Sequence, residues 1–325
     1  MNRPARRRGR PAAILLALLL TACAPAYAPT PVPAPPASPT PTPVPSTSPR
    51  SAPDCEDPLA SYAPPRSNPE PGEMPAGSTM AEIAARGRLV AGVSADTYLM
   101  GSRNPTTGEI EGFDIDLVKA VAEALLGEED AYELRVITAA ERIPVLESGE
   151  VDLVARNMTI TCERWESIAF SAEYYRSGQK VLARTSSGIA SPDDLAGRRV
   201  CAPEGTSSLE RLRTELPEAE AVAAANHTGC LILFQSGEVD AITGDDTVLA
   251  GLVVQDPYAE VLDMEPLSAE PYGLGFNAEQ TDLVAFTNRV LADRIADGSW
   301  EDSYDRWLRP SLGEAPDPPD QVYGR

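Results

Sequence analysis

The stretch Ser148–Asp152 reads SGEVD, and the same five residues return at Ser236–Asp240. Each copy follows a segment with helical apolar spacing and precedes a short apolar segment, so each is expected to join a helix to a strand. Glycine at its second position is typical of a helix end. The repeat predicts two similar lobes rather than one long sheet.

Strands and helices alternate on both sides of each copy. Strands are expected at 89–93, 134–137, 151–155, 199–202, 219–223 and 239–243, and helices at 114–127, 142–149, 207–216 and 228–235. Such alternation implies parallel sheets, and the predicted fold class is therefore α/β.

The carboxyl ends of these strands indicate where a ligand would bind. In open α/β sheets, ligands lie beyond the carboxyl ends of the strands. Five residues past the two repeated aspartates stand Asn157 and Asp245. Both are expected on loops at a sheet edge, where two facing lobes share a ligand.

Composition excludes several functional classes. The 325 residues include 27 Lys and Arg against 49 Asp and Glu, a net charge of −22. Nucleic-acid binding requires a basic surface instead. The single histidine, His227, excludes histidine-rich metal sites, and its place beside Cys230 predicts a structural role.

The first 22 residues are predicted to be an export signal. Five arginines within residues 3–10 precede an apolar run at 12–20, which is too short to span a bilayer. The run ends in Leu20-Thr21-Ala22-Cys23, which resembles the lipobox of bacterial lipoproteins. That resemblance implies cleavage before Cys23 and its lipidation on the outer leaflet of the plasma membrane. The alternative is a plain secretory signal.

Proline-rich segments flank the α/β region. Residues 23–78 are predicted to be a lipid anchor and stalk, because repeated X-Pro favours extended polyproline II. Cys55 could tie down the end of this stalk. Residues 313–325 are expected to form a flexible tail.

Three further motifs carry a family resemblance. They are GFDID at 112–116, TITCER at 159–164 followed by Phe170-Ser171, and GTS at 205–207. Together they resemble the family-3 polar amino-acid-binding proteins of ABC importers, over about residues 80–312. With the long stalk and the Cys201 and Cys230 pair, the chain most resembles actinobacterial glutamate/glutamine-binding lipoproteins.

The resemblance implies a two-lobed, type II periplasmic-binding-protein clamp with two hinge strands. Lobe 1 is expected at 79–182 plus 272–312, and lobe 2 at 183–271. The hinge is then expected near Ala183 and Tyr272, and lobe closure would enclose the ligand.

The resemblance also implies a site for a free amino acid. Arg164 suits the α-carboxylate, because its planar guanidinium binds two oxygens at once. Thr159 and Asn157 match ligand-contacting positions, and Asp245 matches the aspartate that pairs with the α-ammonium. Thr206 and Ser207 open a helix whose N–H groups face the carboxylate. The alternatives are an exposed ion pair for Arg164 and a turn for Asp245.

Recognition of the ligand's side chain is expected from lobe 1. Arg142 resembles the arginine that meets the side-chain carboxylate in glutamate and aspartate binders, and Arg103 is a second candidate. Ser94, Asp96 and Tyr98 are expected to line the pocket. Because Ser94 is not basic, glutamate, aspartate, glutamine and asparagine all remain open.

The predicted function is a lipid-anchored, extracytoplasmic receptor that captures a polar amino acid for an ABC permease. An amino-acid sensor signalling to a membrane partner is the alternative within the same class. An enzyme resembling cyclohexadienyl dehydratases is the second class, but no nucleophile motif or metal cluster is present. The protein is expected to act as a monomer, without cofactor or nucleic acid.

The cysteines predict two disulfides. With Cys23 lipidated, four cysteines remain for an oxidising compartment, which allows three connectivities. A Cys201–Cys230 bridge stays inside one lobe and survives closure, which leaves Cys55–Cys162. The alternative is that Cys162 is a free thiol and Cys55 is unpaired.

Overall fold

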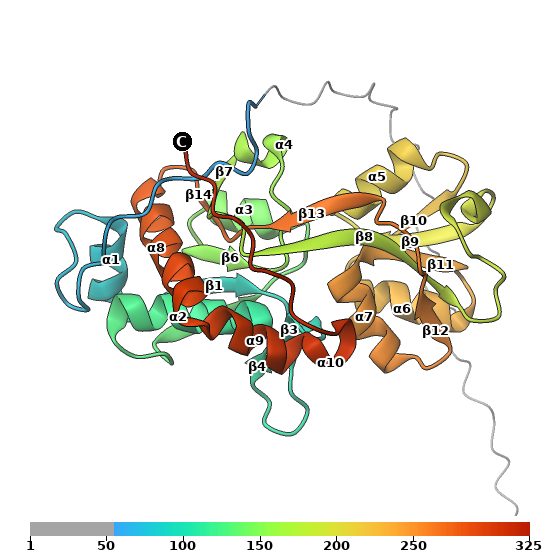
Figure 1. Ribbon diagram of the computed structural model, residues 1–325, viewed down its shortest axis with the longest axis horizontal. Coiled ribbons are helices and arrows are strands. Elements are labelled where there is room, and N and C mark those ends of the chain that lie inside the picture. Colours follow the sequence, from blue (N-terminus) through green and yellow to red (C-terminus); the bar gives the residue numbers. More distant parts are fainter. Residues whose placement is uncertain (1–54) are drawn as a thin grey trace, which may run out of the picture. The chain divides into compact units, whose positions relative to one another are not determined.

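The computed structural model describes residues 55–325. The predicted signal peptide, the lipidated Cys23 and most of the stalk lie outside these residues. The described chain forms two α/β lobes joined by two strands (Figure 1). The two-lobed α/β clamp predicted from the sequence is confirmed.

Lobe 1 is built on a five-stranded sheet in the order β5-β1-β6-β14-β7. The parallel strands are β1 (Leu89–Val93), β5 (Tyr132–Val136) and β6 (Leu153–Ala155), and the others are β7 (Ile168–Phe170) and β14 (Gly275–Asn277). One face packs against α1 (Thr79–Arg86), α2 (Phe113–Leu126) and α8 (Thr281–Asp297), and α3 (Arg142–Glu147) covers the other. Burial of apolar side chains on both faces explains the continuous apolar strands.

A small antiparallel sheet and two short helices complete lobe 1. The sheet consists of β2 (Asp96–Thr97), β3 (Gly101–Arg103) and β4 (Ile110–Glu111). The chain ends with α9 (Ser299–Trp307) and α10 (Arg309–Leu312). Trp300 and Tyr304 of α9 are buried in the lobe 1 core.

Lobe 2 has the strand order β10-β9-β11-β8-β12, with β13 also paired to β8. Its strands are β8 (Tyr175–Arg184), β9 (Arg199–Pro203), β10 (Glu220–Ala224), β11 (Ala241–Asp245), β12 (Ala259–Val261) and β13 (Ser268–Tyr272). Its helices are α5 (Ser207–Glu215), α6 (His227–Ser236), α7 (Asp246–Gln255) and a 3-10 turn at Pro192–Leu195. The two SGEVD copies join α3 to β6 and α6 to β11, as predicted.

The hinge lies earlier in the chain than expected. β8 and β13 pair antiparallel from Tyr175 and Tyr272 onward, and Gln179 already faces Asp245 of β11. Ala183, the expected hinge end, lies between two strands of the lobe 2 sheet. The pairing of the lobe 2 sheet thus begins at Gln179, ahead of the predicted boundary at residue 183, because β8 runs straight on from the crossover into that sheet.

Both flanking segments pack on lobe 1, where a flexible tail was expected at 313–325. Ser61 pairs with Tyr323, and the backbone N–H of Ser61 donates to the carbonyl of Val322 at 3.0 Å. The Arg325 guanidinium stacks on Trp165, with 3.9 Å between its carbon and the ring centroid. The last residues, 320–325, contain no proline, so their backbone N–H and C=O groups can form hydrogen bonds with the segment around Ser61. The tail is therefore held on lobe 1 without a hydrophobic core of its own.

Two disulfides are present, in the expected pairing. Cys55 is bonded to Cys162 at the start of α4 (Cys162–Trp165), with 5.7 Å between the Cα atoms. Cys201 of β9 is bonded to Cys230 of α6, with 5.5 Å between the Cα atoms. The first ties the end of the stalk to lobe 1, and the second lies within lobe 2.

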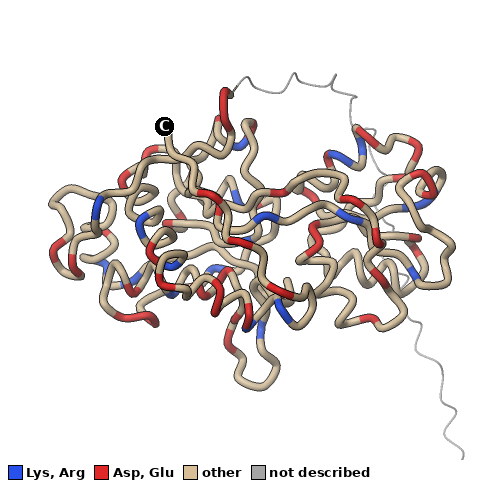
Figure 2. Tube along the Cα trace, viewed as in Figure 1, with Lys and Arg blue, Asp and Glu red and all other residues tan. Residues whose placement is uncertain are grey.

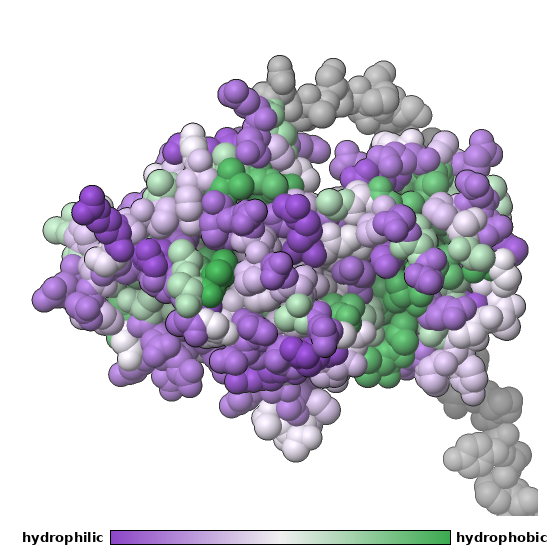
Figure 3. All heavy atoms as spheres, viewed as in Figure 1, coloured by the Kyte–Doolittle hydropathy of each residue, from purple (hydrophilic) through white to green (hydrophobic). Residues whose placement is uncertain are grey.

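Charges are mixed over both lobes, whereas apolar side chains gather in places on the surface (Figure 2 and Figure 3). Acidic residues are spread over both lobes, and basic residues stand among them rather than in one concentrated patch (Figure 2). The face in Figure 3 is mostly hydrophilic, with apolar side chains gathered over lobe 2. Val254 and Tyr258, in lobe 2, are exposed. Within residues 55–325, helices of the length and apolar character required to cross a membrane are absent.

Candidate functional site

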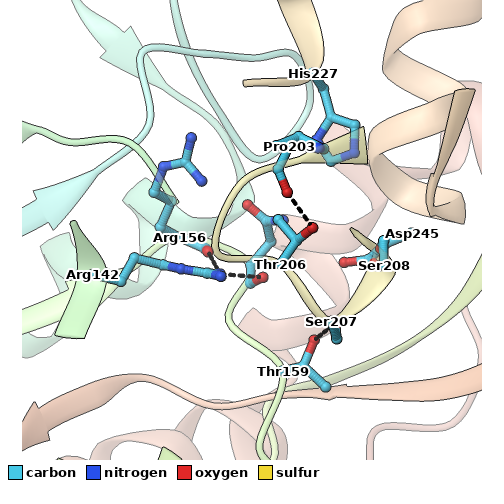
Figure 4. Close-up of a pocket in the computed structure, with 10 residues that line it drawn as sticks. Arg142, Arg156, Thr159, Pro203, Thr206, Ser207, Ser208, His227 and Asp245 are labelled. Carbon is cyan, nitrogen blue, oxygen red and sulfur yellow. Dashed lines mark hydrogen bonds between the residues drawn. The ribbon is translucent and has the colours of Figure 1, made fainter. Parts of the chain in front are cut away.

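A small cavity lies between the two lobes, where strands of both lobes end. Thr206 follows β9, His227 follows β10, and Asp245 ends β11, while the loop after β6 comes from lobe 1. Ten residues line the cavity: Arg142, Arg156, Asn157, Thr159, Pro203, Thr206, Ser207, Ser208, His227 and Asp245 (Figure 4). This is the place expected for a ligand of an α/β sheet.

The lobe 1 side of the cavity is a fixed loop. Asn157 adopts a left-handed backbone conformation, with φ of +34°. Its backbone N–H donates to the Asp114 carboxylate at 2.8 Å, and the Tyr174 hydroxyl donates to the same group at 2.7 Å. Burial raises the pKa of Asp114 to about 6. A strained residue held by a buried carboxylate is typical of a functional loop.

Arg164 stands at the edge of this cavity. Its backbone N–H donates to Thr161, which caps α4. Its guanidinium donates to the carbonyl of Thr159 at 2.6 Å and, across the lobes, to the carbonyl of Gly205 at 3.3 Å. Burial lowers the pKa of Arg164, and the facing acids Glu270 and Asp245 oppose that shift. The guanidinium therefore stays charged at the point where the lobes meet.

The lobe 2 side is the start of α5. Thr206 caps the helix by accepting from the backbone N–H of Leu209 at 3.1 Å. Gly205 has φ of +71°, and a Cβ there would lie 2.6 Å from Cα of Ala140 in lobe 1. Glycine is thus required for the lobes to approach this closely. The first backbone N–H groups of α5 have no partner within the helix and face an anion favourably.

Asp245 supplies negative charge from lobe 2. It is 5% exposed, and the Tyr272 hydroxyl donates to its carboxylate at 2.6 Å. Burial, together with the negative charge of Glu270, raises the pKa of Asp245 to about 7. A buried carboxylate without a cation in contact is suited to bind one.

Glu270 of β13 is a site residue that the sequence did not reveal. Its carboxylate accepts from the hydroxyls of Thr159 at 2.7 Å, Ser207 at 2.8 Å and Ser268 at 2.5 Å. It is fully buried, and it connects both lobes through a hinge strand. Its only sequence signal is a charged residue inside a predicted crossover.

Arg142 lies in the cavity wall but binds backbone. Its guanidinium donates to the carbonyls of Ala139 at 2.9 Å, Arg156 at 3.2 Å and Asn157 at 3.3 Å, and to that of Gly205 at 2.9 Å. Four carbonyls thus occupy most of the five N–H groups of this side chain. The sequence predicted that the guanidinium of Arg142 meets a ligand carboxylate. In the structure it bonds instead to the backbone of three loops and holds them together.

Besides Arg164, four expected residues lie outside the cavity lining: Ser94, Asp96, Tyr98 and Arg103. The Arg103 guanidinium is exposed and donates to the carbonyl of Gly108 within its own hairpin at 2.5 Å. Ser94 is buried, and its hydroxyl bonds to Asp96 and Thr97. Tyr98 is 44% exposed and packs against Gly251 of lobe 2. Ser94 and Arg103 thus bond within their own segment, whereas Tyr98 contacts lobe 2.

Four lining residues were missed or assigned otherwise: Arg156, Pro203, Ser208 and His227. His227, expected to be structural, has its Nε2 buried beside the cavity. Of residues 55–325, no group of three His, Cys, Asp or Glu side chains is placed to hold a metal ion.

Comparison with known proteins gives the family. The model of the bacterial extracellular solute-binding proteins, family 3, matches residues 89–310. The chain belongs to this family.

Two curated relatives and one solved structure are close in sequence. The chain is 34% identical to the ABC transporter glutamine-binding protein GlnH of Bacillus subtilis (strain 168), covering 79% of this chain and 94% of that protein. It is 40% identical to a glutamine-binding protein of Geobacillus stearothermophilus, covering 63% and 78%. An ancestral amino acid-binding protein, a precursor of cyclohexadienyl dehydratase, is similar with a TM-score of 0.65 at 31% identity, covering 71% and 100%.

Proposed function

We propose that this family member captures a free polar amino acid between its lobes and presents it to an ABC importer. The observation that carries the proposal is the pairing of opposite charges at one cavity. Arg164, on lobe 1, donates to the carbonyl of the lining residue Thr159, and Asp245 lines the cavity from lobe 2. A free amino acid brings both complementary charges, and each must be paired once water is excluded.

The α-carboxylate of the ligand would bind Arg164 and the N–H groups that open α5. The α-ammonium would bind Asp245, with Thr159 as a second acceptor. On ligand binding, Arg164 would exchange its long 3.3 Å contact with Gly205 for the carboxylate. A charge-assisted, two-point contact of this kind is stronger than a bond to a neutral carbonyl.

The ligand class we propose is glutamine, glutamate, asparagine or aspartate. The names of the glutamine-binding relatives support an amide, and the arginine-rich cavity wall supports a side chain that ends in oxygen. Lobe closure about the 175–178 and 269–272 crossover would enclose the ligand. Only these four residue pairs separate the two sheets.

The protein would act outside the plasma membrane, as a monomer attached through lipidated Cys23. Cleavage after the lipobox-like Ala22 would leave the proline-rich stalk between lipid and binding lobes. We propose transport rather than signalling, because the named relatives belong to transporters; a sensor would need a different membrane partner.

We propose that the protein is not an enzyme. The similarity to a dehydratase precursor keeps catalysis as the second candidate. An acid catalyst would need a protonated carboxyl beside the substrate. Asp245 instead faces the place of an ammonium, which would keep it ionised.

Calorimetric titration of the purified protein with the twenty amino acids tests this function. We expect tight binding of at least one of glutamine, glutamate, asparagine and aspartate, and an unchanged ligand by NMR after incubation. Failure to bind any of the twenty would contradict the proposal. Conversion of the ligand would favour the enzyme.

A further inference from the structure

One arginine of the cavity has no function in the account above. Arg156 follows β6 and is 5% exposed. Its Nε donates to the carbonyl of Ile137 at 2.9 Å. Within residues 55–325, its two terminal amino groups have no hydrogen-bond partner, although the residue lines the cavity. Four N–H donors are therefore available at the cavity wall.

The charge of Arg156 is also incompletely balanced. Asp96, Asp114 and Glu141 act on it from a distance, but none of the ion pairs formed within residues 55–325 includes Arg156. A buried guanidinium that has one carbonyl partner and no contacting anion is costly, so such a group is retained where a ligand supplies the missing acceptors.

His227 lines the same cavity from lobe 2. Its Nε2 is buried and has no partner within residues 55–325. The ring lies on Gly244, where a Cβ would be 2.5 Å from Nε2. Glycine at this position leaves the space that the imidazole fills. Burial lowers the pKa of His227 to about 4, against the opposing effect of a hydrogen bond to the backbone of Thr243, so the ring is neutral. Its Nε2 is the nitrogen without a partner in residues 55–325.

Arg156 and His227 are separate from the residues assigned to the α-groups. In Figure 4 they lie away from Thr159 and Ser207. Arg142 points toward the backbone carbonyl of Arg156, whereas the guanidinium of Arg156 lies apart from those hydrogen bonds (Figure 4). An amino acid anchored by its α-groups would direct its side chain toward this end.

We infer that Arg156, assisted by His227, recognises the terminal carbonyl oxygen of the ligand side chain. This inference rests on the proposed function. It makes Arg156, rather than Arg142, the residue that separates amino acids ending in an amide or carboxylate from apolar ones of the same length. Arg142 is a positioning residue for the loops around it.

The test is a comparison of ligands with and without that oxygen. Calorimetry on the full chain uses L-glutamine, L-glutamate and L-norvaline, which is similar in length but lacks the terminal polar group. In the wild type, the better of glutamine and glutamate is expected to bind about 100-fold more tightly than norvaline. In R156M, that preference should fall to about threefold or less, with norvaline affinity nearly unchanged.

Three variants serve as controls. R142M should weaken all three ligands by similar factors, because it loosens the loops. R103M, in the exposed hairpin, should match the wild type. H227L should reduce the preference for glutamine over norvaline by about tenfold. This variant tests the inference even if R156M fails to fold.

The outcomes separate the two proposals. If the wild type binds none of the amide or acidic amino acids, the proposed function fails and the inference fails with it. If the wild type prefers glutamine or glutamate and both R156M and H227L keep that preference, only the inference is overturned. Loss of the preference in R142M alone would assign recognition to Arg142.

Discussion

The two SGEVD segments form the same joint in different lobes. Gly149 and Gly237 end their helices with φ of +69° and +78°. Asp152 then accepts from the backbone N–H of Val90 in β1 at 2.7 Å, and Asp240 from that of Arg199 in β9 at 2.9 Å. Each aspartate thus fixes the start of one strand to the neighbouring strand.

The chemistry diverges only a few residues beyond each joint. After β6, the loop carries Arg156 and Thr159 and leads to Arg164. After β11, Asp245 stands at the strand end. One supersecondary unit therefore delivers cationic groups from lobe 1 and an anionic group from lobe 2 to the same cavity. The SGEVD segment therefore determines where each loop lies, and the residues after it determine which charge the loop brings to the cavity.

Removing the positive charge of Arg164 on lobe 1 should lower the ligand affinity more than any other change considered below. Arg164→Ala deletes the proposed partner of the α-carboxylate, and loss of one member of a desolvated charge pair costs about 2–5 kcal/mol of binding free energy. Calorimetry with the tightest amino acid measures it. Unchanged affinity, with the same unfolding midpoint as wild type, would place the carboxylate elsewhere.

Removing the negative charge that lobe 2 supplies, that of Asp245, should lower the ligand affinity less than Arg164→Ala does. It should also change how the affinity depends on pH. The pKa of Asp245 is about 7 in the ligand-free protein, so the carboxyl must lose a proton to bind an ammonium. Wild-type affinity should fall by up to about tenfold per pH unit below pH 7, with proton release on binding.

The variant Asp245→Asn is a control for this pH dependence of the affinity, because the groups around Asp245 stay in place. Glu270, Asp246, Tyr272 and Arg142 act on its carboxyl and remain in Asp245→Asn. The variant should bind about 30-fold more weakly at pH 8 and lose most of the pH dependence. Calorimetric titrations in buffers of different ionisation enthalpy measure the number of protons released on ligand binding. If Asp245→Asn released as many protons as the wild type, they would come from a group other than Asp245.

The two joints should differ in stability. The Asp152 side chain is 10% exposed and pairs with Arg86, whereas the Asp240 side chain, which pairs with Arg199, is 32% exposed. Asp152→Ala should lower the free energy of unfolding by about 2–3 kcal/mol and Asp240→Ala by about 1 kcal/mol, because only the first leaves a fully buried N–H unpaired. Chemical denaturation measures both, and equal losses would show that the joints are buried alike.

The sequence predicted the lobes because the repeat and the strand–helix alternation are local signals. It pointed to Arg164, Thr159 and Asp245 through motifs. In the structure Thr159 and Asp245 line one cavity, and Arg164 lies beside it, bonded to the carbonyl of Thr159. Glu270 was missed because two of its three partners, Thr159 and Ser207, lie in distant segments of the chain. The function of Arg142 could not be read for the same reason, since folding alone brings four carbonyls to its guanidinium.

The hinge and the tail show a second limit. Apolar patterning marks β8 as a strand but does not say at which residue its partner changes from β13 to β11. The tail composition predicts that no core forms, yet backbone pairing between Ser61 and Tyr323 holds it to lobe 1. Pairings between distant segments decide both features.

Small-angle X-ray scattering of the purified protein tests the central claim, which is capture by lobe closure. The lobes touch at Gly205 and Ala140, and the cavity lies between them, so on our proposal the crossover strands bend to admit a ligand. We expect a larger radius of gyration without ligand and a decrease with a saturating concentration of the tightest-binding amino acid. Identical dimensions in the two states, with binding verified by calorimetry in the same sample, would contradict the account.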